Sequence, residues 1–153
     1  MLTINEYRKV ESLEEAYELN QKKNNKIIAG GVWMKIGDRR IATAIDLSGL
    51  GLDQITETDT EFVIGAMTTL REIEKHAGLA AYTDGAIRES VRHIVGVQFR
   101  NLATVGGSIF GRFGFSDVLT MFLALDTWVE LYNGGTIPLA PVSYTHLTLP
   151  TIA

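Results

Sequence analysis

The sequence predicts an α+β fold of two lobes. Three observations support this prediction: capped helical segments with one apolar side, short β-type segments between them, and a turn-like acidic stretch over residues 50–60 that separates two such groups. A chain of 153 residues has the length of one domain or of two small lobes that share a groove. We therefore expect a first lobe over residues 1–50 and a second over residues 51–140.

The composition indicates a folded protein and excludes several kinds of function. The chain is 46% hydrophobic and 21% charged, so it has enough apolar material for a packed core and is not disordered. Fourteen Lys and Arg against eighteen Asp and Glu give a net charge of −4. Nucleic-acid binding normally needs a basic surface, so we expect no DNA or RNA partner. The sequence has no cysteine, which excludes disulfides and an iron–sulfur cluster held by this chain itself.

No apolar run approaches the roughly 18 residues of a membrane-spanning helix. The start, MLTINEYRKVES, has no hydrophobic segment of the secretory type. These two features predict a cytoplasmic protein that does not bind a membrane.

The first lobe begins with a helix. Ser12 and Glu15 have the spacing of a capping box, and the helix runs to about Lys22. Residues 26–29 are β-type and lead straight into Gly30-Gly31, and residues 42–47 are a second strand before a Ser-Gly turn. The first lobe is therefore β/α with a glycine loop.

The second lobe begins with a strand over residues 62–64. Thr69 and Glu72 form another capping box, which opens a helix to about His76. Asp84 is the expected cap of a third helix that ends at Gly96, with an apolar stripe of Ile87, Val91, Ile94 and Val95.

The end of the second lobe contains a helix and a strand. Ser116 is the expected cap of a helix over residues 117–125, and residues 128–132 alternate as a strand before the Asn133-Gly134 turn. Residues 141–153 are Thr-rich and have neither helical nor strand periodicity. We interpret them as a non-native tail and exclude them from the fold.

Two glycine pairs are the candidate functional segments. Gly30-Gly31 and Gly106-Gly107 each follow a β-type run, and the absence of side chains lets successive backbone N–H groups bind an anion such as a pyrophosphate. Neither pair matches the G-x-G-x-x-G dinucleotide fingerprint or the phosphate loop of P-loop proteins. For either pair taken alone, a tight turn or bulge is the commoner explanation.

The order of the motifs makes the pairs informative. The chain contains IIAGGVWMK, then VIGAMTTLREIE, then VGVQFRNLATVGGSI, then a Ser-Asp pair followed by LALDTWVELYNGG. Over residues 2–139 this series resembles the FAD-binding subunit of the molybdenum hydroxylases, the xanthine dehydrogenase and carbon monoxide dehydrogenase flavoprotein family. The most specific part is RNLATVGGS, residues 100–108. Relatives continue with a C-terminal α/β domain, so the chain resembles a C-terminally truncated member.

The resemblance implies a fold and a set of cofactor-binding residues. The fold is the PCMH-type (vanillyl-alcohol-oxidase-like) FAD-binding fold, in which FAD lies extended between the two lobes. The backbone amides of Ile28, Ala29, Gly30, Gly31, Val32, Trp33 and Met34 would wrap the diphosphate, and Thr104, Val105, Gly106, Gly107 and Ser108 would complete that cradle. Gly65, Ala66, Thr68 and Thr69 would lie near the flavin, Ile94 would be its apolar neighbour, and Asp117 would accept hydrogen bonds from the FAD ribose.

Two segments depart from the family pattern. Val32-Trp33 stands where many relatives have Thr-Asp, and Ser108 replaces a common Asn. The departures concern side chains, so the amide contacts expected of both segments are unaffected.

The implied function is that of an electron-transfer subunit in which no side chain is catalytic. A 2Fe-2S subunit would deliver electrons to FAD, which would pass them to NAD+ or another acceptor. A molybdopterin-binding subunit would carry out the hydroxylation, with a xanthine dehydrogenase-like purine reaction expected. The alternative is a nucleotide-binding or assembly module without redox turnover.

Other candidate residues have simpler explanations. His76, His93 and His146 lack metal-ligand spacing, and the serines lack the G-x-S-x-G pattern of a nucleophile, so neither a metal site nor a hydrolase is expected. The aromatic residues of the segment 110–115 either pack in a core or contact FAD or a partner subunit. Arg100 is either a functional interface charge or half of a structural ion pair.

Overall fold

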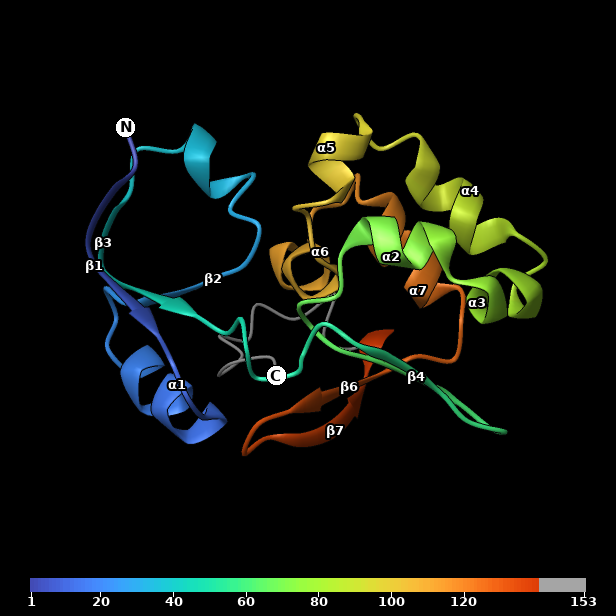
Figure 1. Ribbon diagram of the computed structural model, residues 1–153, viewed down its shortest axis with the longest axis horizontal. Coiled ribbons are helices and arrows are strands. Elements are labelled where there is room, and N and C mark those ends of the chain that lie inside the picture. The colour runs from blue at the N-terminus through green and yellow to red at the C-terminus, as the bar shows by residue number, and fades with distance from the viewer. Residues whose placement is uncertain (141–153) are drawn as a thin grey trace.

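The computed structural model describes residues 1–140, so the expected non-native tail over residues 141–153 lies outside the described residues. The elements form two groups, which stand side by side in Figure 1. A small sheet with one helix makes up the N-terminal group, and a bundle of short helices with two hairpins makes up the other. The α+β class expected from the sequence is confirmed.

The first group is a parallel sheet in the order β1-β3-β2. The central strand is buried through Ile41, Ala44 and Ile45, while every residue of β1 is exposed. Ala16, on the helix, is fully buried in the same apolar cluster as Ile45. The elements in chain order are β1 (Thr3–Lys9), α1 (Leu13–Asn20), β2 (Lys26–Ile28), the 3₁₀ turn η1 (Met34–Ile36) and β3 (Arg40–Asp46).

The second group has its own core, built from short helices over two antiparallel hairpins, β4-β5 and β6-β7. Leu70, Ile73, Ile87 and Val91 contribute buried side chains from two of the helices. The elements are β4 (Ile55–Glu57), β5 (Phe62–Ile64), α2 (Leu70–Lys75), α3 (Ala77–Tyr82), α4 (Ala86–Arg92), α5 (Val97–Arg100), α6 (Val105–Gly111), α7 (Asp117–Leu123), β6 (Trp128–Leu131) and β7 (Gly135–Pro138). Met67 and Leu52 pack against the first group's cluster, so a boundary near residue 50 stays a prediction.

The expected helix caps are largely present. Ser12, Thr69 and Ser116 each accept a hydrogen bond from the backbone N–H three residues on, at the start of α1, α2 and α7. Thr69 and Glu72 form the reciprocal capping box. Asp84, in contrast, is not a cap: Gly85 occupies that position, at a φ of +80°.

Three other expectations are corrected by the structure. The stretch 50–60, expected to be a turn-like seam, contains β4, which pairs with β5. Val95 does not extend the apolar stripe of α4, because the helix ends at Arg92 and Val95 is 80% exposed. The second glycine pair does not follow a strand but lies in the first turns of α6.

Candidate functional site

The first glycine segment offers backbone donors that the chain does not use. Within residues 1–140, the N–H groups of Gly30, Gly31, Val32 and Trp33 donate to no protein acceptor. Their carbonyls are partly used: Gly31 accepts from the amide of Lys35 and Trp33 from that of Ile36, which fixes the turn that leads into η1. Gly31 has a φ of +65°, the left-handed conformation in which successive amides form an anion-binding nest.

Gly30 also lies at a close contact between the two groups of elements. A Cβ on Gly30 would overlap the carbonyl oxygen of Leu102 and would lie 3.1 Å from the amide nitrogen of Ala103. Only glycine allows this approach of two backbones. The free amides of the first segment are therefore held directly beside the start of the second glycine segment.

The second glycine segment is physically different from the first. The amides of Val105 and Gly106 donate to the carbonyls of Thr68 and Ala66, both at 2.9 Å. Gly107 donates to the hydroxyl of Thr104 at 3.1 Å, and the amide of Ser108 donates to the Thr104 carbonyl. Four of the five amides expected in this segment, those of Val105, Gly106, Gly107 and Ser108, therefore have an acceptor within the chain.

The segment containing Gly65, Ala66, Thr68 and Thr69 lies against that helix start. Thr69 forms a β-bridge with Thr104, and the amide of Leu70 donates to the carbonyl of Ala103. Thr68 is fully buried and its hydroxyl donates to the carbonyl of Gln54, while Thr69 caps α2. The structure thus brings three of the expected site segments together around residues 102–106.

The remaining expected residues occupy separate positions. Ile28 ends β2, Ala29 follows it, and Met34 begins η1. Asp117 is the exposed first residue of α7, next to its cap Ser116. Ile94 is partly buried against the helical core, and its carbonyl accepts a hydrogen bond from the guanidinium of Arg100.

Arg100 belongs to a buried ion-pair network. Its Nε lies 2.8 Å from Oε2 of Glu74, and Arg71 lies 2.8 Å from Oε1 of the same carboxylate. Burial favours the protonated carboxyl of Glu74, but the hydrogen bonds from Arg71 and Arg100 outweigh it, so its pKa is below the ordinary value. Of the two roles expected for Arg100, the structure gives it the structural ion pair.

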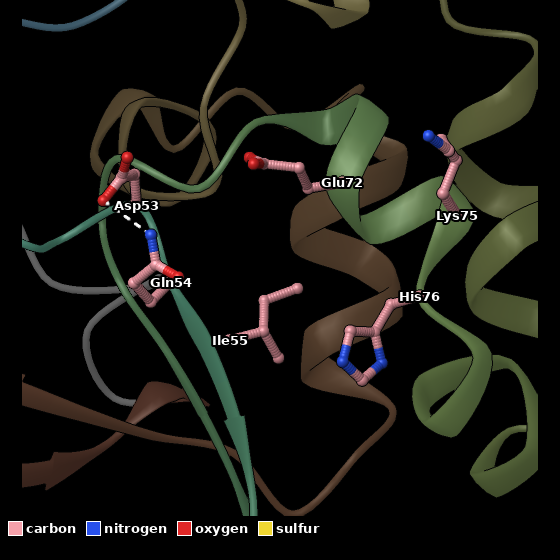
Figure 2. Close-up of a pocket in the computed structure, with 6 residues that line it drawn as sticks. All are labelled: Asp53, Gln54, Ile55, Glu72, Lys75 and His76. Carbon is pink, nitrogen blue, oxygen red and sulfur yellow. Dashed lines mark hydrogen bonds between the residues drawn. The ribbon is translucent and has the colours of Figure 1, made fainter.

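A pocket of about 290 Å³, lined by no residue of either glycine segment, lies between β4 and α2 (Figure 2). Most of its polar groups already have structural roles. Glu72 completes the Thr69 capping box, Nδ1 of His76 accepts from the amide of Leu79, and Asp53 accepts from Gln54. In the part of the chain that the structure describes, no cluster of His, Cys, Asp or Glu has the makings of a metal site.

The first glycine segment fits a diphosphate, because it presents four amides without protein acceptors at a position where only glycine fits. The family comparison names a ligand for the domain as a whole: residues 3–144 match the model of the FAD binding domain in molybdopterin dehydrogenase. The chain belongs to this family. FAD is the cofactor of the domain, and the FAD-binding fold expected from the motifs is confirmed.

Related proteins place the domain in context. It is 30% identical over 142 residues to YgfM, an uncharacterized protein of Escherichia coli strain K12, covering 88% of this chain and 52% of that protein. A carbon monoxide dehydrogenase from Hydrogenophaga pseudoflava that lacks the Mo-pyranopterin moiety of its cofactor superposes with a TM-score of 0.81 at 25% identity, over 97% of this chain and 59% of that one. Quinoline 2-oxidoreductase from Pseudomonas putida 86 gives a TM-score of 0.81 at 19% identity, over 96% and 56%.

This FAD-binding domain spans about half the length of the relatives it matches. No helix within residues 1–140 has the length and apolar content needed to cross a membrane. Two residues at the site were not singled out from the sequence. Leu102 supplies the backbone against Gly30, and Glu74 holds Arg100; neither contact has a sequence signal, since both join segments distant in the chain.

Proposed function

We propose that this domain holds FAD for electron transfer in a molybdenum-containing hydroxylase. The observation that supports the proposal most is the run of free amides at Gly30 to Trp33 in a chain that belongs to the FAD-binding family. A diphosphate is a strong acceptor, so it satisfies donors that are otherwise left without protein partners. When bound, the flavin supplies both one-electron and two-electron transfer.

The chain's own residues bind and orient rather than catalyse. The amides of Gly30, Gly31, Val32 and Trp33 donate to the diphosphate oxygens. Ile28, Ala29 and Met34 flank them along the chain. The segment from Gly65 to Thr69 and the side chain of Ile94 border the flavin, and the carboxylate of Asp117 accepts from the ribose hydroxyls.

The second glycine segment has a different role in this proposal. Because the amides of Val105, Gly106, Gly107 and Ser108 have acceptors within the chain, this segment contributes mainly shape. A Cβ on Gly106 would lie 2.6 Å from the Ala66 carbonyl oxygen, so glycine is required there for packing. Thr104 contributes as the cap of α6.

We further propose partners and a direction of electron flow. A 2Fe-2S subunit would deliver electrons from a molybdopterin-binding subunit to the FAD that this domain holds, for transfer to NAD+ or another acceptor. The absence of cysteine from these 153 residues supports a cluster that is held elsewhere in the enzyme, because they offer no thiolate ligands. A xanthine dehydrogenase-like purine reaction rests on the sequence motifs alone.

A nucleotide-binding or assembly module without redox turnover is the second candidate. The engaged amides of the second segment favour it, since they leave only one of the two glycine segments free to bind a diphosphate. The two candidates differ in whether the bound nucleotide exchanges electrons.

Titration of the 153-residue chain with FAD separates them. We expect one FAD per chain and a higher melting temperature with FAD, since a ligand that binds only the folded state stabilises it. With molybdopterin and 2Fe-2S subunits added, substrate should bleach the flavin absorbance, and without them it should not. FAD binding with no bleaching in the assembled complex would support the assembly module, and no FAD binding would contradict the proposal.

A further inference from the structure

We propose that Trp33, Phe113 and Phe115 form an aromatic wall on which a planar heteroaromatic ring of the bound dinucleotide stacks, with Trp33 as the contacting ring. The inference rests on the proposed function, because it takes the diphosphate to lie on the free amides. It adds a side-chain contact for the ring to the backbone contacts for the phosphates.

Trp33 lies within the segment that is proposed to bind the diphosphate. Trp33 supplies one of the four free amides, so its indole is attached to the segment that holds the diphosphate. In a dinucleotide, each phosphate is joined through one sugar or sugar alcohol to a planar ring. A ring held against the indole is therefore compatible with a diphosphate held at the neighbouring amides.

The three rings of the aromatic wall pack against one another. The Trp33 centroid lies 5.5 Å from that of Phe113 and 5.9 Å from that of Phe115, and the two phenyl rings stack at 5.2 Å. Trp33 comes from the first group of elements and the phenylalanines from the second. The cluster thus lies across the two lobes between which FAD is expected, and it backs one side of the indole.

The three rings of the aromatic wall are accessible to a ligand. Trp33 is 53% exposed, Phe113 39% and Phe115 68%, and none of them belongs to either buried cluster. Contiguous exposed apolar side chains are a feature of ligand-binding grooves and interaction sites. The indole and phenyl rings present flat apolar faces, against which a heteroaromatic ring can stack.

The phenylalanines are held in place by the chain around them. Arg112 ends α6 in the left-handed conformation, with a φ of +49°. The carbonyl of Phe113 accepts from the amide of Ser116 at 3.0 Å, and Ser116 in turn caps α7. A Cβ on Gly111 would lie 2.8 Å from the Phe113 ring, so glycine makes room for it. The wall is a formed feature rather than a loose loop.

The test compares Trp33→Ala with Trp128→Ala in the full 153-residue chain. Trp128, on β6, is a matched control: it is 56% exposed and makes no ring contact among the described residues. We expect Trp33→Ala to raise the Kd of FAD by about 2- to 10-fold, the range of an aromatic pair, and Trp128→Ala to leave it unchanged. Trp33→Phe should retain most of the affinity, and circular dichroism checks folding.

Two probes identify the stacked ring. If Trp33→Ala weakens riboflavin and not ADP, the isoalloxazine stacks; if it weakens ADP and not riboflavin, the adenine does. In Trp128→Ala the only tryptophan is Trp33, so FAD should quench its fluorescence with the same saturation curve as binding. Equal FAD affinity in wild type and Trp33→Ala would overturn the wall while leaving the proposed function intact. Failure of the wild type to bind FAD would overturn both.

Discussion

Replacing Gly30 by alanine should destabilise the domain by about 3 kcal/mol or more and abolish FAD binding. The added methyl group overlaps the backbone carbonyl of Leu102, and a backbone atom cannot move aside as a flexible side chain can. The two groups of elements would have to separate at this point, which moves the free amides away from Ala103 and its neighbours. Urea unfolding, together with FAD titration, measures both effects.

Gly114→Ala is the matched control for that variant. No atom lies within 4 Å of a Cβ at Gly114, and its φ is not in the left-handed region, so alanine should be tolerated there. Wild-type stability in Gly30→Ala would contradict the close approach of the two backbones on which the site depends.

Arg100→Met should cost about 2 kcal/mol of folding free energy, in the range of a hydrogen bond to a charged group. The substitution leaves the Glu74 carboxylate, whose side chain is only 13% exposed, with Arg71 as its remaining cation, and removes the donor to the Ile94 carbonyl. Because Glu74 keeps Arg71 as a cation, the cost comes from the lost hydrogen bonds of the Arg100 guanidinium to the Glu74 carboxylate and the Ile94 carbonyl. The same change should loosen the segment around Ile94.

Arg92→Ala provides the control, because the Arg92–Glu89 pair is exposed and such pairs contribute about 0–1 kcal/mol. The pH profile provides a second readout. The pKa of Glu74 is lower in the folded state, so the pair's stabilisation is complete above the ordinary carboxyl pKa of about 4.3 and is lost as pH falls through the folded-state value. Wild type and Arg100→Met should therefore converge in stability towards acid pH, and a constant difference would contradict this origin.

Local signals in the sequence predicted much of the fold. Ser12, Thr69 and Ser116 cap helices where their spacing indicated, and residues 62–64 form the expected strand. The hairpin of β6 and β7 turns at Asn133, which has a φ of +57°. Asparagine adopts this left-handed conformation more readily than most residues, which accounts for its presence in the turn. Each of these features depends on residues that are close together in the chain, so it can be predicted without knowledge of tertiary contacts.

Tertiary contacts decided the features that the sequence did not predict. β1 is exposed on both faces, so it has no apolar alternation to reveal it. The glycine pair in α6 disfavours a helix by propensity, and the helix starts there because Val105 and Gly106 donate to Thr68 and Ala66. The sequence likewise presented the two glycine pairs as equivalent, whereas their hydrogen bonding separates them.

The central claim is that FAD binds through the free amides of the first glycine segment. Amide proton and nitrogen shifts of the ¹⁵N-labelled chain, recorded during titration with FAD, test it most directly. The account predicts the largest amide proton shifts at Gly30, Gly31, Val32 and Trp33, and smaller shifts at Val105 to Ser108, whose acceptors lie within the chain. FAD binding that leaves the amides of residues 30–33 unshifted would contradict it.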